Sequence, residues 1–433
     1  MRPVELDPVA RRLSRAYTVR DLRTIARART PRSIFDYVDG AAEAEVSIRR
    51  ARRVLRDVEF QPSVLRDVGT VDLGTTVLGR PAAAPFVYAP TGFTRMMQHE
   101  GEPAVARSAA RTGVPYTLST MGTTSIEDLA AAAPDGRNWF GLYVWKDRGA
   151  SRELMARARE SGYEALVITV DVPVGGARLR DDRNGFSIPP ALSPKVVLDG
   201  ALHPAWWLNF LTTEPLRFAT LDAWQGTIEE LAAHMFDPTV ELDDLAWVRE
   251  HWDGPLVVKG VQTVADAQRV VGAGADAVVL SNHGGRQLDR APVPLTRVPG
   301  TVDAVGDRAE VYVDTGFSNG GDVVAALALG ARAETFPGLA GMGDLMATCA
   351  SPDSRNHRLG LHIGRGMSLD EATAATGGTA EGVKSSRSVL DLAERAGVEM
   401  PITAAVVQVL HEGLPVDALA PLLLGRPRKA EGV

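Results

Sequence analysis

The stretch from Ser281 to Asp289 carries the residue types best suited to chemistry in this chain of 433 residues. Within it, His283 and Arg286 flank two consecutive glycines. Histidine exchanges protons near neutral pH, and arginine binds carboxylates through a planar fork of N–H donors. The glycines permit a tight bend and the close approach of a ligand. A bare His-Gly-Gly is common loop material, so the prediction of a site depends on the whole stretch.

Short apolar runs that alternate with helix-like segments must position this stretch. The run Ala277–Leu280 directly precedes it and indicates a buried parallel strand. Alternation of this kind predicts a parallel sheet of α/β class, here a (β/α)8 TIM-barrel type with seven strand–helix units readable. The predicted strands are Pro85–Ala89, Tyr116–Leu118, Phe140–Val144, Ala165–Val170, Leu256–Lys259, Ala277–Leu280 and Val311–Asp314.

Polar residues and glycines cluster directly after these strands. Because the carboxyl ends of parallel barrel strands meet at one rim, this pattern predicts that function lines that rim. Taken singly, these residues are equally consistent with helix caps, strand-end charges and solvated surface. The clusters contain Pro90, Thr91, Gly92, Ser119, Tyr143, Thr169, Asp171, Lys259, Ser281, Asp314 and Gly316.

The motifs together resemble those of the FMN-dependent α-hydroxy-acid dehydrogenases and oxidases, in the order of that family over about residues 10–331. The resemblance implies an FMN cofactor and oxidation of an L-2-hydroxy acid, most like L-lactate, to the 2-oxo acid. His283 resembles the catalytic base, and Asp171 its carboxylate partner. The residues that resemble the substrate-binding set are Tyr37, Tyr143, Arg178 and Arg286. Those that resemble the FMN-binding set are Pro90, Thr91, Gly92, Ser119, Thr169, Lys259, Ser281, Asp314 and Gly316.

The chain departs from that family at three places. Gly141 stands where the family usually has a glutamine that contacts the flavin ring. After Asp314-Thr315-Gly316 the chain continues Phe317-Ser318, whereas the family places a phosphate-binding arginine at the second position. Beyond Arg332 we find neither a β-branched run nor the Gly-Arg pair that ends the family's eighth strand. We therefore predict that the eighth strand–helix unit is replaced.

The tail, about residues 332–433, resembles the C-terminal helical domain of NAD(P)-dependent glycerol-3-phosphate dehydrogenase. We therefore predict two domains, a barrel over 1–331 and a small all-α domain over 332–433. Both families carry a segment like Leu327–Arg332, so a fusion at that stretch, in the gene or in its assembled sequence, is our hypothesis. The tail has no Gly-x-Gly-x-x-Gly dinucleotide motif to accompany it. Its residues matching substrate- or nucleotide-contacting positions are Asp344, Ser354, Arg355, Asn356 and Glu381.

Composition limits the partners. A net charge of −7 argues against nucleic acid, and the single cysteine, Cys349, excludes an internal disulfide framework and a cysteine-based metal cluster. We expect a cytoplasmic homo-oligomer that uses a quinone, a cytochrome or oxygen as electron acceptor, with peripheral attachment to the inner membrane face left open. A long insertion, Gly175–Asp244, predicts a lid or a subunit contact in preference to a membrane contact.

Two alternatives to an active flavoenzyme remain from the sequence. The first is an inactive or impaired fusion protein without flavin, because loss of a strand–helix unit opens a barrel and exposes sheet edges. The second is an NAD(P)-dependent glycerol-3-phosphate dehydrogenase, which only the tail favours.

Overall fold

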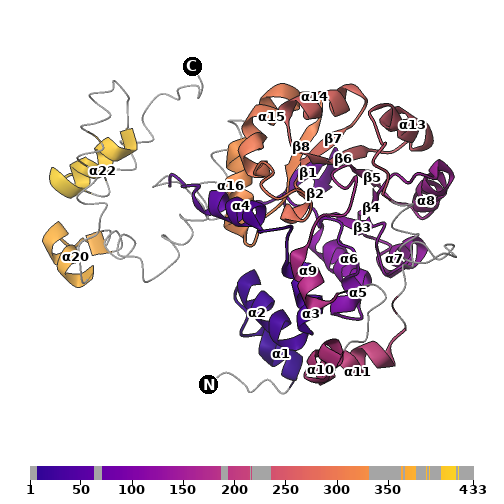
Figure 1. Cartoon of the computed structure of the whole chain (residues 1–433). Coiled ribbons are helices and arrows are strands. Elements are labelled where there is room, and N and C mark those ends of the chain that lie inside the picture. Colours follow the sequence, from indigo (N-terminus) through magenta and orange to yellow (C-terminus); the bar gives the residue numbers. More distant parts are fainter. Residues whose placement is uncertain are drawn as a thin grey trace. The chain divides into compact units, whose positions relative to one another are not determined.

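The computed structural model describes residues 7–62, 71–186, 194–214, 216 and 236–330, and in the tail 362–363, 366–376, 387, 390, 401–415 and 418. The chain divides into two compact units. The first consists of Met1–Glu59 and Leu73–Arg332, and the second of Phe60–Asp72 and Ala333–Val433. Among the described residues, the first unit contains both sheets and nearly all of the helices (Figure 1).

Six parallel strands form the central sheet of the first unit, in the order β3-β4-β5-β6-β7-β8 (Figure 1). Chain order and spatial order are the same, as in a TIM-type barrel. Ahead of β3, a single parallel bridge joins Tyr88 to Tyr116. On the other side, β8 has no strand partner beyond β7 among the described residues. The strands are β3 (Tyr116–Ser119), β4 (Asn138–Leu142), β5 (Ala165–Thr169), β6 (Leu256–Val261), β7 (Ala277–Leu280) and β8 (Glu310–Val313).

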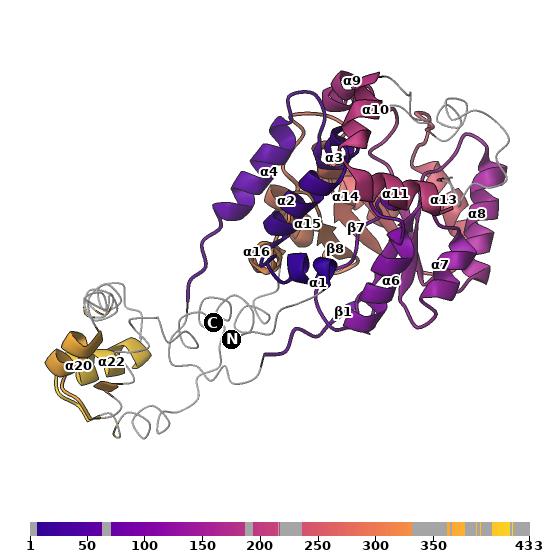
Figure 2. The same ribbon diagram turned by 90° about the horizontal axis from the view of Figure 1, so that it is seen from below.

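Helices follow the strands and surround the sheet in the views of Figures 1 and 2. Side chains of alternate strand positions, such as Leu118, Phe140 and Ile168, join the large apolar core between the sheet and these helices. This outward set explains why the strands are nearly continuous apolar runs. The helices of this layer are α6 (Gly101–Thr112), α7 (Ile126–Ala132), α8 (Arg148–Glu160), α13 (Asp243–His251), α14 (Val264–Gly272), α15 (Val298–Val305) and α16 (Gly320–Gly330).

The remaining strand positions point to the inside of the sheet and form a second, smaller core. Trp139, Val167 and Val257 belong to it. The antiparallel hairpin of β1 (Thr75–Val77) and β2 (Arg80–Ala82) covers this core with Val77 and Ala82. Because the hairpin also meets Glu310 at the start of β8, it fills the amino-terminal end of the sheet and leaves the carboxyl end for function.

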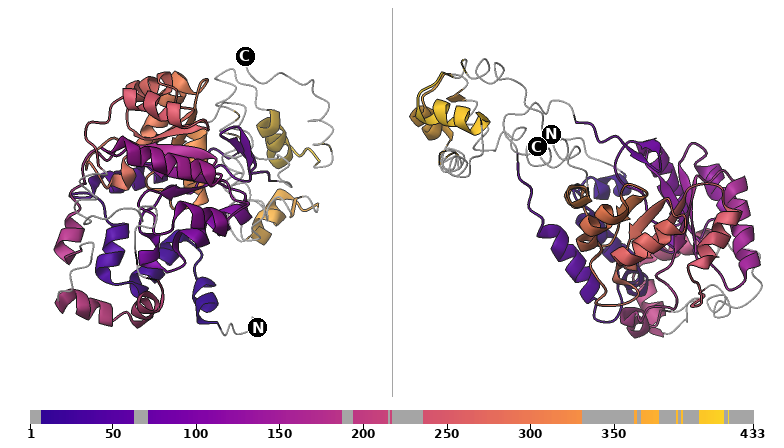
Figure 3. Two further views of the ribbon diagram at one scale, coloured as in Figure 1. Left: turned by 90° about the vertical axis from the view of Figure 1, so that its right-hand side faces the viewer. Right: turned by 90° about the horizontal axis from the view of Figure 1, so that it is seen from above.

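Segments from the amino-terminal part of the chain lie together with helices of the connection between β5 and β6, whereas α4 contacts α16 (Figures 1 and 3). Thr18 caps α2 through a capping box with Asp21, as its sequence pattern predicts. Asp289 caps α4 from a distance, since its carboxylate accepts a hydrogen bond from Ser47 N at 2.8 Å. The segments are α1 (Pro8–Leu13), α2 (Val19–Arg29), α3 (Arg32–Asp39), α4 (Val46–Arg56), α5 (Thr94–Met97), α9 (Leu179–Asn184), α10 (Pro194–Ala201) and α11 (Pro204–Thr212).

The structure confirms the predicted parallel α/β architecture and corrects two strands. The fourth strand in the chain's numbering, β4, begins at Asn138 and ends at Leu142, two residues earlier than predicted. The predicted strand Pro85–Ala89 is reduced to the bridge at Tyr88. In the second unit the described elements are helical, namely α20 (Leu369–Thr376) and α22 (Pro401–His411). No helix in the described part of the chain is long and apolar enough to cross a membrane.

Candidate active site

The predicted rim exists at the carboxyl ends of the strands. At the end of each strand, the last inward-facing position carries a small or polar side chain, whereas most inward-facing positions earlier in the strands are apolar. Ser119 lies beside Gly141 in the β3–β4 register, and Thr169 beside Lys259 in the β5–β6 register. Ser281 and Asp314 directly follow β7 and β8. The strand pattern alone therefore brings most of the predicted cofactor residues to one ring.

His283 and Asp171 form a hydrogen-bonded pair at this rim. The His283 Nδ1 atom lies 3.0 Å from Asp171 Oδ1, and the Asp171 side chain is only 1% exposed. Burial raises the pKa of Asp171, but the hydrogen bond from His283 and the charge of Lys259 outweigh it and lower the pKa overall. Asp171 is therefore an anion that can orient the imidazole and stabilise its protonated form.

A dense set of hydrogen bonds holds the loop of η2 (His283–Gly285). His283 has a left-handed backbone, with φ of 59°, and its N–H donates to Ser281 Oγ at 3.0 Å. The fully buried Asn282 accepts hydrogen bonds from Gly285 N at 2.9 Å and from Thr315 Oγ1 at 3.0 Å. A left-handed non-glycine residue is strained, so the loop geometry is imposed by these contacts.

Lys259 is a buried cation beside two other predicted cofactor residues. Its Nζ lies 3.0 Å from Ser281 Oγ and 3.0 Å from Asp314 Oδ2. Burial lowers the pKa of Lys259, but the carboxylates of Asp314 and Asp171 outweigh burial and raise the pKa overall, so the ammonium form is favoured. The rim thus holds a buried ammonium group between two carboxylates.

A bulge in β6 makes room for Asp171. The β6–β7 register shifts between Lys259 and Val261, and the intervening Gly260 has φ of 110°. A Cβ atom at Gly260 would lie 2.7 Å from both Cβ and Cγ of Asp171. Glycine is therefore required on conformational and on steric grounds.

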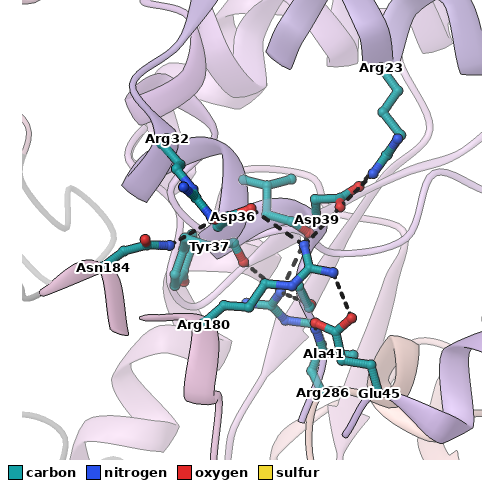
Figure 4. Close-up of polar contacts among 12 residues, drawn as sticks. Arg23, Arg32, Asp36, Tyr37, Asp39, Ala41, Glu45, Arg180, Asn184 and Arg286 are labelled. Atoms are coloured by element: carbon teal, nitrogen blue, oxygen red, sulfur yellow. Dashed lines mark hydrogen bonds and ion pairs between the residues drawn. The ribbon is translucent and has the colours of Figure 1, made fainter. Parts of the chain in front are cut away.

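Beside the His283–Asp171 pair, three side chains meet, namely those of Tyr37, Arg178 and Arg286. The Cζ atoms of Arg178 and Arg286 lie 4.9 Å and 5.1 Å from the centre of the Tyr37 ring. Arg286 Nη1 donates to the carbonyl oxygens of Tyr37 at 2.6 Å and Gly40 at 3.0 Å, as Figure 4 shows in part. Burial and the charge of Arg178 lower the pKa of Arg286. Two guanidinium groups at one aromatic ring suit an anionic ligand.

The structure places the other predicted residues around the same rim. Tyr143 is half-buried, and burial raises its pKa to about 12, so it is a hydroxyl donor at neutral pH. Pro90 approaches β4, since a Cβ atom on Gly141 would lie 3.1 Å from Pro90 Cβ. Thr91 is exposed, and Gly92 packs against Met121. The predicted tail residues Asp344, Ser354, Arg355, Asn356 and Glu381 lie outside the described residues.

The rim residues are compatible in chemistry with the ring end of a flavin. Ser119, Gly141 and Thr169 have small side chains or none, and Lys259 is a buried cation beside them. Gly141 cannot simply be exchanged for the family's glutamine, because Pro90 Cβ and Leu118 O at 3.1 Å and 3.2 Å confine its Cβ.

At the expected phosphate end, Ser318 donates through N and Oγ to Asp322 at 2.7 Å and 3.0 Å and supplies no positive charge.

Sequence reasoning missed two groups of supporting residues. The first group, Asn282 and Thr315, fixes the His283 loop. The only sequence signal for this role was that each residue lies next to a predicted site residue. A cluster formed by Asp36, Asp39 and Glu45 around Arg180 lies beside Tyr37 (Figure 4). The signal available for that cluster was the pair of acidic residues spaced by three along one face of a short helix.

Two family models match the chain in succession. The model described as FMN-dependent dehydrogenase matches residues 26–341. The model described as NAD-dependent glycerol-3-phosphate dehydrogenase C-terminus matches residues 317–420. The matches overlap over residues 317–341, which include the predicted junction at Leu327–Arg332.

Similar proteins extend the first match. A Mycobacterium tuberculosis relative, provisionally named as an L-lactate dehydrogenase, is 56% identical over 343 residues, covering 79% of this chain and 83% of its own. An L-lactate dehydrogenase of Caulobacter vibrioides is 44% identical over 319 residues, covering 72% and 83%. The structure of the monotopic membrane protein (S)-mandelate dehydrogenase is 38% identical with a TM-score of 0.70, covering 76% and 90%. A mandelate oxidase structure is 39% identical with a TM-score of 0.63, covering 76% and 88%.

Proposed function

The chain belongs to the FMN-dependent dehydrogenase family, and from that premise we propose that it oxidises an L-2-hydroxy acid, L-lactate or a close analogue, to the 2-oxo acid. FMN is the cofactor of the family. The observation that carries the proposal is the His283–Asp171 pair at 3.0 Å, on a rim that also holds the buried Lys259. Lactate is favoured over bulkier acids because two relatives carry L-lactate dehydrogenase names.

His283 is the proposed base. Asp171 occupies its Nδ1, and Nε2 has no hydrogen-bond partner among the described residues, so Nε2 is left for the substrate hydroxyl. As His283 takes the hydroxyl proton, the anionic Asp171 stabilises the imidazolium that forms. FMN supplies the acceptor for the hydride that leaves C2, a task that no side chain can perform.

Arg286 and Arg178 are the proposed carboxylate ligands. Arg286 uses Nη1 for the carbonyls of Tyr37 and Gly40, which leaves Nη2 and Nε without a hydrogen-bond partner among the described residues. A fork of two N–H donors matches the two oxygens of a carboxylate. The hydroxyl groups of Tyr37 and Tyr143 are proposed as further donors, since the phenol of Tyr143 stays protonated at neutral pH.

Lys259 is the proposed cation beside the flavin ring, with Ser119, Thr169, Ser281 and Asp314 around it. The residues Pro90, Thr91, Gly92 and Gly316 complete the proposed cofactor set. We also propose the two-domain division at 331/332, with a fusion at Leu327–Arg332, because the two family matches overlap there. The tail residues keep their predicted glycerol-3-phosphate dehydrogenase-like roles as a proposal only.

One experiment separates the proposal from its alternatives. Purified protein should be yellow, and L-lactate should bleach the flavin absorbance under anaerobic conditions. His283→Asn should retain FMN and lose the bleaching. Colourless protein that added FMN does not reconstitute would instead support an inactive fusion. Consumption of NADH with dihydroxyacetone phosphate would support a glycerol-3-phosphate dehydrogenase.

We further propose peripheral membrane attachment through α10 and α11. Leu198, Leu202, Leu208 and Leu211, on these helices and the turn between them, are 66%, 72%, 63% and 71% exposed, and the similar (S)-mandelate dehydrogenase is described as a monotopic membrane protein. Such attachment would favour a membrane quinone as the electron acceptor. Co-sedimentation with phospholipid vesicles should weaken in Leu202→Ser with Leu211→Ser. The control Leu288→Ser, at another exposed leucine, should sediment like the parent protein.

A further inference from the structure

We propose that Arg180 is a positioning residue, which aligns Tyr37 and Arg178 for the substrate carboxylate by binding three acidic side chains at once. The inference rests on the proposed function, because it concerns the same carboxylate site. The Arg180 guanidinium is directed toward the carboxylates of Asp36, Asp39 and Glu45, at the end of α3 and just before α4 (Figure 4). Its effect on substrate therefore acts through the residues that it holds.

Arg180 is the centre of a compact ion-pair cluster. Its Nη1 lies 3.4 Å from Asp36 Oδ1 and 3.1 Å from Asp39 Oδ2, and its Nη2 lies 2.6 Å from Glu45 Oε2. The three acidic side chains are only 13%, 9% and 15% exposed. Burial lowers the pKa of Arg180, but Glu45 and Asp39 raise it overall. The Arg180 side chain is 34% exposed, so salt screens these pairs less than fully exposed surface pairs but still weakens them.

The cluster and Arg286 both bind the carboxyl-terminal end of α3. Asp36 and Asp39 flank Tyr37 on α3, and Arg286 binds the carbonyls of Tyr37 and Gly40. The last turn of α3 is thus fixed through its side chains by one arginine and through its carbonyls by another. A Cβ atom on Gly40 would lie 3.3 Å from Arg180 Cδ, so the stem of Arg180 lies directly over this turn.

The cluster also fixes the element that presents Arg178. Arg178 is the residue before α9, a helix of six residues, and has no capping hydrogen bond of its own. Residues 187–193 after α9 lie outside the described residues. Two residues of α9 bind α3, namely Arg180 and Asn184, whose Nδ2 donates to Asp36 Oδ2 at 2.7 Å. These contacts place the Arg178 guanidinium 4.9 Å from the Tyr37 ring.

Charge balance gives the cluster a second effect on substrate. Asp39 has a second cation, because Arg23 binds it at 2.8 Å. Asp36 has a weaker one, because the Arg32 side chain is 77% exposed and lies 3.4 Å from it. Without Arg180, Glu45 loses its only side-chain cation among the described residues. The cluster would then carry an uncompensated negative charge beside the site for an anion, which would weaken substrate binding.

The test compares Arg180→Met with Arg180→Lys and a matched control. The control is Arg157→Met, which removes a two-point ion pair with Glu127 at 2.8 Å and 2.9 Å on the outer helices. In the full-length flavoprotein, Arg180→Met should raise KM for L-lactate about tenfold and change kcat by less than about threefold, because ground-state binding is what it disturbs. Arg180→Lys should recover part of the loss, since one ammonium group cannot reach three carboxylates.

A readout that does not need turnover completes the design. Calorimetric binding of oxalate, a dicarboxylate, should weaken in Arg180→Met by the same factor as KM, and Arg157→Met should bind like the parent. Circular dichroism and thermal unfolding show whether each variant is folded. If parent protein oxidises lactate and folded Arg180→Met keeps the parent KM and oxalate affinity, the positioning role is wrong. If parent protein neither oxidises lactate nor binds oxalate, the proposed function itself fails, and with it this role.

Discussion

Replacement of Asp171 by asparagine should remove most of the driving force for proton transfer to His283 while leaving the shape of the site intact. In the parent protein the Asp171 side chain is 1% exposed and lies 3.0 Å from His283 Nδ1. Unit charges about 4 Å apart attract by about 4 kcal/mol at the effective dielectric constant of about 20 that suits protein sites. Asparagine retains a hydrogen bond worth about 1 kcal/mol, so we expect a net loss of about 3 kcal/mol.

That loss corresponds to a decrease of about 100-fold in the rate of flavin reduction, because each 1.36 kcal/mol is a factor of ten. An asparagine amide that donates to Nδ1 would also select the tautomer with a proton on Nε2, which cannot accept another. The rate is measured by anaerobic stopped-flow mixing with L-lactate, with FMN content determined for each preparation. Asp266→Asn, at a half-exposed carboxylate on α14, is the control. A folded, FMN-loaded Asp171→Asn that reduces its flavin within about fivefold of the parent rate, under 1 kcal/mol, would refute this account of the pair.

Three further predictions follow from the same rim. Lys259→Met should lower the free energy of unfolding by about 1–3 kcal/mol in urea titrations, because it removes the cation that pairs with the half-buried Asp314, and an unchanged midpoint would contradict this. Gly260→Ala should cost about 1–3 kcal/mol in thermal unfolding and slow lactate oxidation, since φ is 110° there and the new Cβ meets Asp171; parent-like melting and rate would show that the bulge relaxes freely. Burial raises the pKa values of Asp171 and Asp39, but His283 and Arg23 respectively outweigh it and lower both pKa values in the folded protein. The stabilisation that these two carboxylates contribute is therefore complete above the unfolded pKa of about 4 and disappears as the pH falls through the lower folded pKa values. The urea midpoint should therefore decrease as the pH is lowered from about 5 to about 3. A constant midpoint over that interval would show that Asp171 and Asp39 do not have lowered pKa values in the folded protein.

Local patterns explain why most of the sheet was predictable. The outward positions of each strand are apolar, and polar residues begin where the strand ends, so the sequence alone located the rim. The predicted strand Pro85–Ala89 failed because Pro85, like Pro90 just beyond it, lacks the N–H that a ladder needs, which leaves pairing only around Tyr88. The start of β4 was missed because Asn138 is polar, although its amide binds the carbonyl of Ala133 inside the fold.

Long-range geometry was not predictable in the same way. The left-handed backbones of His283 and Thr315 depend on contacts between two different strand ends. The partners of Arg180 lie between 135 and 144 residues away along the chain, and the local spacing of Asp36 and Asp39 does not identify Arg180 as their partner. The predicted roles of the site residues remain proposals, whereas the family and its cofactor follow from the comparisons.

The pairing of β5 with β6 has a consequence for how this chain can change over time. These strands are hydrogen-bonded neighbours, although the connection from Val170 to Pro255 between them carries α9, α10, α11 and α13. The entropy of closing a loop grows only with the logarithm of its length, so doubling a connection costs about 0.6 kcal/mol. Distal parts of this connection can therefore be lengthened, shortened or exchanged with little effect on the strands beneath. Evolution, or an engineer, can thus alter this connection while the rim beneath it is inherited unchanged.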